Sequence, residues 1–374
     1  MNKKLLSLAI ATAFAAPAAM ATEMTVYGLA NVAVTNINPG TGVNAGADYW
    51  DLNSGASRLG VKGSEDLGNG LKAIYKMEFQ IAMSDTEATN GIRDNDNGQI
   101  SYRNTYVGLA GDWGTFLMGR HDTPLKISTG ALDLFSDSIG DYNQGGLLMA
   151  NPVDGVENNV TMAGLGFVDA RADNAIAYVS PNMNGFTLAA AIVPAGNSTV
   201  TNAALGAGAD NNRADGLAEA YSVAAMYSNG PFYASLAYED YSDDVLTAQP
   251  AATSLGLNLT RVGLGYTANN FHVGFVYEAQ DMVGELAPGR DIDVWQLSGS
   301  YTFGNNVVKA AYGERDAGAT WVGNATQADA DQITVGLDHN FSKKTKAYAV
   351  YTDVDSATLG SDWSALSVGL RTNF

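Results

Sequence analysis

The chain has 374 residues, of which 46% are hydrophobic and 16% charged, with 39 acidic against 20 basic side chains and no cysteine. The acidic excess argues against a nucleic-acid binder, because phosphate contacts need clustered Lys and Arg. The lack of cysteine excludes disulfide scaffolds, thiolate zinc sites and cysteine nucleophiles.

The first residues have the pattern of a secretory signal peptide. Residues 2–4 form a short basic segment, residues 5–16 form an apolar segment, and residues 19–21 form a small-x-small cleavage motif. This apolar stretch is too short to span a bilayer, so we expect a signal peptide over residues 1–21 rather than an anchor helix. Its removal leaves 18 of the 20 basic side chains and all 39 acidic ones, a formal charge of −21. The sequence therefore predicts an exported, strongly acidic mature chain, residues 22–374.

The mature chain repeats segments of about ten residues in which apolar and polar side chains alternate, as in a β-strand. In the last segment one face carries Leu366, Val368, Leu370 and Phe374, and the opposite face carries Ser367, Gly369, Arg371 and Asn373. The segments beginning near residues 271, 295 and 332 show the same alternation. One face of each predicted strand is thus apolar and often aromatic.

The connections between these strands alternate between short and long. Seven short connections are rich in turn-forming residues and lie at 65–70, 111–114, 181–185, 229–231, 269–270, 304–306 and 342–345. Seven turns join fourteen strands, and the first and last strands bring the number to sixteen. Eight long, Gly-, Asn- and Asp-rich segments lie on the other side. This asymmetry predicts an all-β fold, a sixteen-stranded antiparallel transmembrane β-barrel with short periplasmic turns and long extracellular loops.

Soluble β-sandwiches and propellers also alternate, but their outward faces should be polar and their loops need not alternate in length. Here aromatic residues occur at the ends of the apolar faces, as in the interfacial girdles of membrane proteins. They include Tyr27, Trp113, Trp295, Tyr301 and Phe374. A bilayer also demands closure of the sheet, since unpaired strand edges have no partner in hydrocarbon. These features favour the membrane barrel.

Residues 57–73, SRLGVKGSEDLGNGLKA, resemble the second strand, first periplasmic turn and third strand of a known family, the trimeric general porins of Gram-negative outer membranes. Residues 106–109 and 119–124 resemble its fourth and fifth strands leading into loop 3, and residues 171–181 its sixth strand. Phe374 resembles its terminal assembly signal. The C-terminal half matches mainly in pattern.

The resemblance implies a water-filled pore narrowed by a third loop that folds into the lumen. Residues 121–170 form the longest interruption of the strand pattern, and a loop of that length is usually functional. By position we expect Asp133, Asp137 and Asp141 to be the acids of this loop at the constriction. The resemblance places Arg58, Arg103 and Arg171 on the facing basic wall, with Arg120 as a reserve candidate. The alternatives are solvated loop acids, and arginines that pair with carboxylates or bind lipopolysaccharide at the rim.

No enzyme signature stands out. None of the three histidines has a metal-protease spacing, and the chain has no Gly-Lys pair for a phosphate loop. We therefore expect a non-enzymatic channel without cofactor or metal, passing ions and small hydrophilic solutes by passive diffusion. A substrate-selective channel, for example for an oligosaccharide, should show a track of aromatic residues in the lumen. A barrel adhesin or enzyme is the rival of a different class.

The resemblance further implies a homotrimer in the outer membrane of a Gram-negative bacterium, surrounded by lipid and lipopolysaccharide and inserted by the barrel-assembly machinery. Small residues of the first strand, Gly28, Ala30 and Ala33, would allow subunits to approach closely. If the arginines and loop acids cancel at the constriction, acids near the mouth should decide ion selectivity. These acids are Asp85, Glu87, Asp240, Asp243, Asp244, Asp281 and Glu285. We therefore expect a weak to moderate preference for cations.

Overall fold

A computed structural model describes residues 24–40, 48–84, 100–143, 164–194, 216–248, 253–283, 290–317, 329–357 and 362–374. It contains one short helix, α2, over Pro124–Thr129. The strands are β1 Thr25–Asn38, β2 Tyr49–Ser54, β3 Arg58–Gly68, β4 Leu71–Ile81, β5 Ile100–Gly111, β6 Gly114–Asp122, β7 Arg171–Val179, β8 Phe186–Val193, β9 Ala220–Asn229, β10 Phe232–Ala248, β11 Thr253–Ala268, β12 Phe271–Val283, β13 Arg290–Phe303, β14 Asn306–Asp316, β15 Ala330–Asn340, β16 Thr345–Ser356 and β17 Trp363–Asn373. The predicted signal peptide lies outside the described residues.

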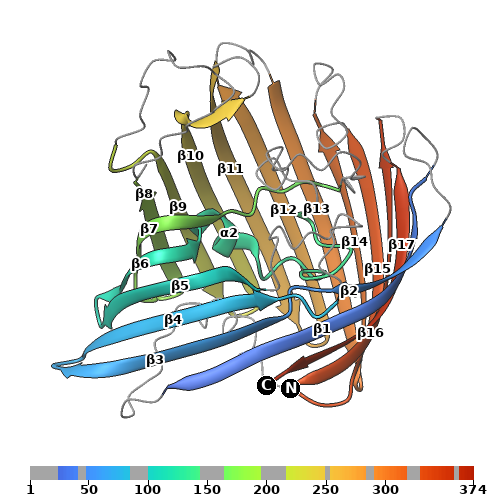
Figure 1. The fold of residues 1–374 in the computed structure, drawn as a ribbon, viewed down its shortest axis with the longest axis horizontal. Coiled ribbons are helices and arrows are strands. Elements are labelled where there is room, and N and C mark those ends of the chain that lie inside the picture. The colour runs from blue at the N-terminus through green and yellow to red at the C-terminus, as the bar shows by residue number, and fades with distance from the viewer. Residues whose placement is uncertain are drawn as a thin grey trace.

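The strands form one antiparallel sheet that closes on itself (Figure 1). From β3 onward each strand pairs with the next along the chain, and β1 pairs with β17 over ten residue pairs. Both β2 and β3 pair with β1, β2 through residues 49–54 and β3 through residues 58–62. They are therefore the two halves of one strand, interrupted at residues 55–57. With β2 and β3 counted as one, the barrel has the sixteen strands that the sequence predicts.

The alternating pattern corresponds to the two faces of the barrel wall. On β17 the outward side chains Leu366, Val368 and Leu370 are 44–56% exposed, while Ser367 between them is 3% exposed. Large apolar side chains cover the outside of β12, β13 and β15 in the same way. Polar side chains such as Gln296, Thr334 and Thr352 point inward. An apolar outer face and a polar inner face are what a barrel in lipid requires.

All seven predicted short turns are confirmed as connections between neighbouring strands. They join β3 to β4, β5 to β6, β7 to β8, β9 to β10, β11 to β12, β13 to β14 and β15 to β16. Asn69 and Gly70 in the first of them have positive φ angles of 52° and 77°, as expected for a tight hairpin. No helix in the described part of the chain is long and apolar enough to cross a membrane.

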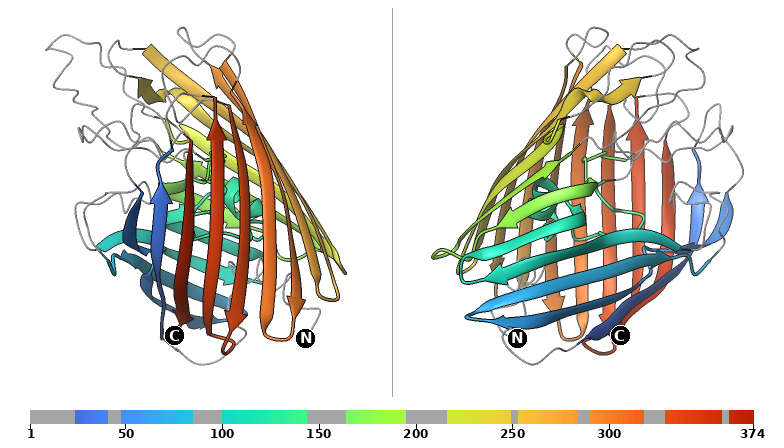
Figure 2. Two further views of the ribbon diagram at one scale, coloured as in Figure 1. Left: turned by 90° about the vertical axis from the view of Figure 1, so that its right-hand side faces the viewer. Right: turned by 60° about the vertical axis from the view of Figure 1, so that its left-hand side comes forward.

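The longest connection joins β6 to β7 and enters the barrel. Its helix α2 lies inside the ring of strands in all three views (Figures 1 and 2) and contacts β8, β9, β10 and β11. We call residues 123–170 loop 3; residues 144–163 of it lie outside the described residues. The described part of loop 3 therefore lies inside the barrel.

The C-terminal residue completes the seam between the first and last strands. The Gly28 amide donates to the Phe374 carbonyl and the Phe374 amide donates to the Gly28 carbonyl, both at 3.1 Å. The Phe374 ring covers Gly28 so closely that a Cβ at this glycine would lie 2.3 Å from it. Only a glycine leaves room for the Phe374 ring at position 28. Ala33 faces inward, where it is 6% exposed and packs with Phe135 and Ile139 of loop 3. Ala33 therefore cannot serve the subunit contact that the sequence suggested, whereas a contact at Gly28 and Ala30 stays a prediction.

Replacing Gly28 with Leu should impair barrel closure, because the new side chain would displace the Phe374 ring from the seam. We expect a smaller fraction of protein that migrates as the compact form in unheated detergent gels, and a similar loss on deletion of Phe374. Leu370→Ala, which shortens an outward side chain of the same strand, is the matched control. Normal folding of Gly28→Leu would show that the terminal ring does not support the seam.

Candidate functional site: the constriction formed by loop 3

The start of loop 3 is fixed by helix α2. The Thr123 hydroxyl caps the helix by accepting from the Lys126 amide at 3.4 Å, and Pro124 begins it. The Leu125 amide donates to the Ser222 hydroxyl of β9, and the Tyr233 hydroxyl of β10 donates to the Ser128 carbonyl. The sequence thus starts a helix of six residues and attaches both of its ends to the barrel wall.

Beyond the helix, loop 3 follows the inner wall from β11 to β16. The Ser298 hydroxyl of β13 donates to the Leu132 carbonyl, and the Lys309 ammonium group of β14 donates to the Leu134 carbonyl at 3.0 Å. Glycines on the wall leave room for the loop: a Cβ at Gly265 would lie 2.9 Å from Leu132, and one at Gly336 2.9 Å from Phe135. Loop 3 therefore lies against the wall and does not hang free in the lumen.

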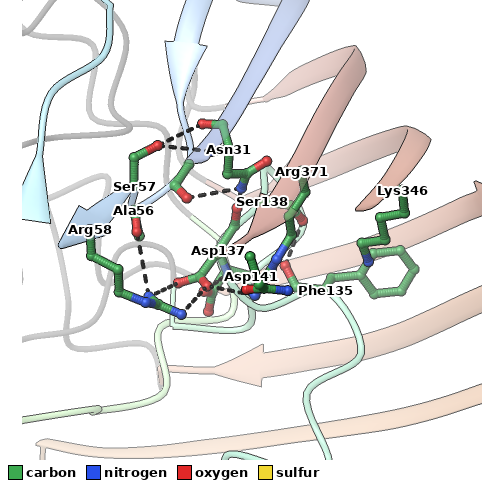
Figure 3. A network of polar contacts seen from close by, with 12 residues as sticks. Asn31, Ala56, Ser57, Arg58, Phe135, Asp137, Ser138, Asp141, Lys346 and Arg371 are labelled. Atoms are coloured by element: carbon green, nitrogen blue, oxygen red, sulfur yellow. Dashed lines mark hydrogen bonds and ion pairs between the residues drawn. The ribbon is translucent and has the colours of Figure 1, made fainter. Parts of the chain in front are cut away.

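The tip of loop 3 reaches the opposite seam of the barrel. Asp137, with a φ angle of 62°, pairs with Arg58 of β3 at 3.2 Å and with Arg371 of β17 at 3.5 Å (Figure 3). The Asn31 amide group of β1 donates to the Asp137 carbonyl at 3.0 Å and to the Gly55 carbonyl at 2.9 Å. Backbone and side-chain contacts together thus fix the tip where β2 and β3 are interrupted.

The wall next to this tip carries a row of paired charges. Arg103 of β5 pairs with Glu78 of β4 at 3.0 Å, and Arg171 of β7 pairs with Asp122 of β6 at 2.9 Å. Arg103 also lies within electrostatic range of Arg58 and Arg171. The three arginines expected on the wall therefore belong to one cluster, on alternate strands, with a carboxylate on each strand between them.

Each of the three carboxylates in this cluster serves two cations. Glu78 also pairs with Lys76 at 3.1 Å, and Asp122 also pairs with Lys126 at 3.3 Å. Asp137 is shared by Arg58 and Arg371. We call these nine residues the constriction cluster: Arg58, Lys76, Arg103, Lys126, Arg171, Arg371, Glu78, Asp122 and Asp137.

Arg120, the reserve candidate, has a different partner. It continues the outward-facing side of β6 with Phe116 and Met118, and it pairs with Asp173, whose side chain is 65% exposed. No described contact joins Arg120 to loop 3. It lies on the outer face of the barrel because side chains two residues apart on a strand share a face.

Two of the three expected loop acids are turned into the loop instead of toward the wall. The Asp141 carboxylate accepts from the Asp137 amide at 3.0 Å and from the Asn143 amide at 3.1 Å, and Asp133 accepts from the Phe135 amide at 2.9 Å. The carboxyl groups of Asp133 and Asp141 are also close enough to influence each other's protonation. They therefore shape the turn, and among the three only Asp137 meets the arginines.

The pKa values of these acids follow from their surroundings. Burial raises the pKa of Asp141 to about 6, and burial together with repulsion from Asp141 raises the pKa of Asp133 well above its usual range. Burial would also raise the pKa of Asp137, but Arg58, Arg371 and Arg103 outweigh it and hold this pKa below its usual value. Of these three acids, Asp137 is therefore the one whose charged form the surrounding arginines stabilise.

Sequence reasoning missed most of the partners in the constriction cluster. Lys76 and Glu78 are charged residues on the inward face of β4, and their two-residue spacing is a signal that could have identified them. Arg371 lies on the predicted inward face of the last strand, but nothing in the sequence connects it to Asp137. No group of three or more His, Asp and Glu side chains in the described ranges is arranged to hold a metal ion.

The raised pKa values predict how stability depends on pH. Because the folded state raises the pKa values of Asp133 and Asp141, protonation of these acids favours folding. This contribution is fully present below the usual pKa of about 4 and is lost as the pH rises through about 6, the folded-state pKa of Asp141. Asp133→Asn should flatten this component, because an amide does not titrate and does not repel the Asp141 carboxylate. The measurement is the thermal midpoint across this range in detergent. Asp173→Asn on the outer face is the control, and identical pH profiles for Asp133→Asn and the unmodified protein would contradict the assignment.

Comparisons with known proteins agree with this architecture. Residues 7–359 match the family model described as Gram-negative porin. Outer membrane porin protein 32 of Delftia acidovorans is 28% identical over 369 residues, covering 96% of this chain and 92% of that protein. An anion-selective porin from Comamonas acidovorans superposes with a TM-score of 0.72 at 22% identity, covering 94% of this chain and all of that one. OmpT of Vibrio cholerae in its trimer form gives 0.61 at 18% identity, covering 95% and 100%.

The family match spans nearly the whole chain, and the closed barrel with loop 3 in its lumen is the corresponding architecture. The chain therefore belongs to the Gram-negative porin family, and it is a non-enzymatic diffusion channel of the outer membrane.

Proposed function

We propose that this porin passes small hydrophilic solutes and ions by passive diffusion and prefers anions weakly. The observation that carries the preference is the composition of the constriction cluster, in which six cations share three carboxylates, an excess of three positive charges. The cation side chains are 15–24% exposed and those of the carboxylates 7–19%. A solute at this level meets mainly positive charge, and fixed charge at a narrow section selects ions by sign.

This proposal reverses the preference for cations that the sequence led us to expect. That expectation assumed that Asp133, Asp137 and Asp141 all face the arginines, so that the local charges cancel. Asp133 and Asp141 are instead bonded within the loop, and Arg371 adds a cation at Asp137.

Two of the seven acids expected near the mouth have described side chains, and neither faces the lumen. Asp240 and Asp281 lie on outward faces of β10 and β12, where Asp240 accepts from the Tyr238 hydroxyl at 3.3 Å. For the other five, Asp85, Glu87, Asp243, Asp244 and Glu285, no side-chain position is described. The anion selectivity stated for the similar Comamonas acidovorans porin agrees with the reversed proposal.

The described lumen does not favour the oligosaccharide-selective alternative. Tyr348 is 8% exposed and donates to the Asn31 side chain at 2.9 Å, and Tyr27 donates to Glu78 at 2.8 Å. Phe135, on the lumen side of the wall, is 1% exposed beneath Lys309. A sugar track needs exposed aromatic faces, and these rings are covered or bonded.

We propose further that the mature chain begins near Thr22, assembles as a homotrimer, and depends on the barrel-assembly machinery with Phe374 as its signal. Outer-membrane lipid and lipopolysaccharide would surround it. The trimer form of the similar Vibrio cholerae protein supports the oligomeric state, and the basic and apolar regions of residues 1–21 support the cleavage site. Trp50 at 70% and Tyr102 at 67% exposure are large side chains on the outer face that a neighbouring subunit or lipid would cover.

Selectivity is tested by the reversal potential under a potassium chloride gradient across a planar bilayer. We expect the unmodified protein to give the sign of weak anion preference, stronger at about 0.1 M than at about 1 M salt because screening shortens from about 10 to about 3 Å. Asp137→Asn should increase this preference, and Arg103→Gln should shift the potential toward cations. Arg120→Gln, which changes the same kind of charge on the outer face, should leave it unchanged. A cation-selective unmodified protein would contradict the charge argument.

Native mass spectrometry of protein extracted from outer membranes tests the assembly proposal. The expected species contains three chains, each lacking the first 21 residues. Peptide mapping of the released monomer locates the first residue. A predominant monomer under mild extraction, or a retained Met1, would refute the corresponding part of the proposal.

A further inference from the structure

Arg261 of β11 is a buried charge on the inner wall that lies outside the constriction cluster. It is 0% exposed, as is its partner Glu278 on the neighbouring strand β12. The Arg261 Nε donates to Glu278 at 2.6 Å, and Nη2 lies 2.5 Å from the same carboxylate. Burying charged groups is costly unless every polar atom has a partner, so such a pair needs an explanation in the fold.

The remaining donors of Arg261 all reach loop 3. Nη1 donates to Asp169 at 2.7 Å and to the Thr129 hydroxyl at 3.0 Å, with the Tyr142 hydroxyl at 3.4 Å, and Nη2 donates to the Val168 carbonyl at 2.9 Å. These contacts occupy all five N–H donors of the guanidinium group. Thr129 and Tyr142 belong to the outgoing limb of loop 3, whereas Val168 and Asp169 belong to its returning limb.

Neighbouring groups extend this attachment. The other Glu278 oxygen accepts from the Val168 amide at 2.9 Å and from Gln280 at 2.8 Å, and Gln280 also donates to the Gly166 carbonyl at 3.1 Å. The guanidinium group lies 5.4 Å from the centre of the Phe167 ring. One side chain of the wall therefore joins both limbs of loop 3 to each other and to the barrel.

We propose that Arg261 is a positioning residue for loop 3, and that its contacts hold both limbs against the wall and so set the open cross-section of the channel. This role rests on the established porin channel and is independent of the proposed anion preference. It requires the planar fork of arginine, because a lysine ammonium group carries the same charge but cannot reach the two limbs and Glu278 together.

The test compares Arg261→Lys and Arg261→Met with the unmodified protein in single-channel recordings. We expect both variants to lose the single stable conductance level and to show several levels with greater open-channel noise, as the limbs leave the wall. Arg261→Lys retains the charge, so extra levels in this variant would come from the loss of the guanidinium fork. Arg120→Met, in an ion pair on the outer face, should behave as the unmodified protein. A single unchanged level in both Arg261 variants would overturn the proposal.

A tether separates loop displacement from general damage to the barrel. A Cβ at Gly140 would lie 2.4 Å from the Thr334 methyl carbon, and the chain has no cysteine of its own. Gly140→Cys with Thr334→Cys should therefore allow a disulfide between loop 3 and β15. In the Arg261→Lys background, oxidation should restore a single level and dithiothreitol should remove it again. If the tether forms but the extra levels persist, they do not come from loop 3 and the proposal fails.

Discussion

The structure depends on one constraint, which is that a sheet edge in hydrocarbon has no partner for its amide and carbonyl groups. The sheet therefore closes, and the β1 to β17 pairing with the reciprocal bonds of Gly28 and Phe374 completes it. Closure gives the sheet an outer face in contact with lipid and an inner face in contact with water. Each strand therefore carries apolar side chains on its outer face and polar side chains on its inner face. The lumen and every property of the channel follow from that division.

A closed sixteen-stranded barrel is wider than its side chains can fill, and loop 3 narrows it. The loop keeps its backbone hydrogen-bonded by lying on the wall, with glycines beneath Leu132 and Phe135. Loop 3 is attached to the wall at two places, its tip and its two limbs, and the contacts at the two places differ. At the tip, Asn31 binds the backbone of Asp137 while Arg58 and Arg371 bind its charge. At the limbs, Arg261 is fully buried, and removing one partner of such a pair costs roughly 3–5 kcal/mol.

The fold could be predicted because its signals are local. Alternation within ten residues and turn residues such as Asn69 and Gly70 determine strands and hairpins without knowledge of distant contacts. The interruption at residues 55–57 was missed, since it depends on Asn31 and the tip of loop 3.

The site was harder to predict because its contacts join distant parts of the chain. Arg261 meets Thr129, Tyr142 and Asp169, which are 132, 119 and 92 residues away. Of the three loop 3 acids expected at the constriction, Asp137 alone pairs with wall arginines, because the loop backbone turns there at a positive φ while Asp141 binds backbone amides. The assumption that all three acids face the wall arginines was therefore wrong for Asp133 and Asp141, although Asp137 does pair with Arg58.

The central claim is that the closed barrel with loop 3 on its wall leaves a continuous water-filled passage. The most direct measurement is single-channel conductance in planar bilayers as a function of potassium chloride concentration. A water-filled pore predicts a conductance that rises in proportion to the conductivity of the bulk solution at high salt, where fixed charges are screened. The absence of channels, or a conductance that saturates at moderate salt as for a tight binding site, would contradict the account.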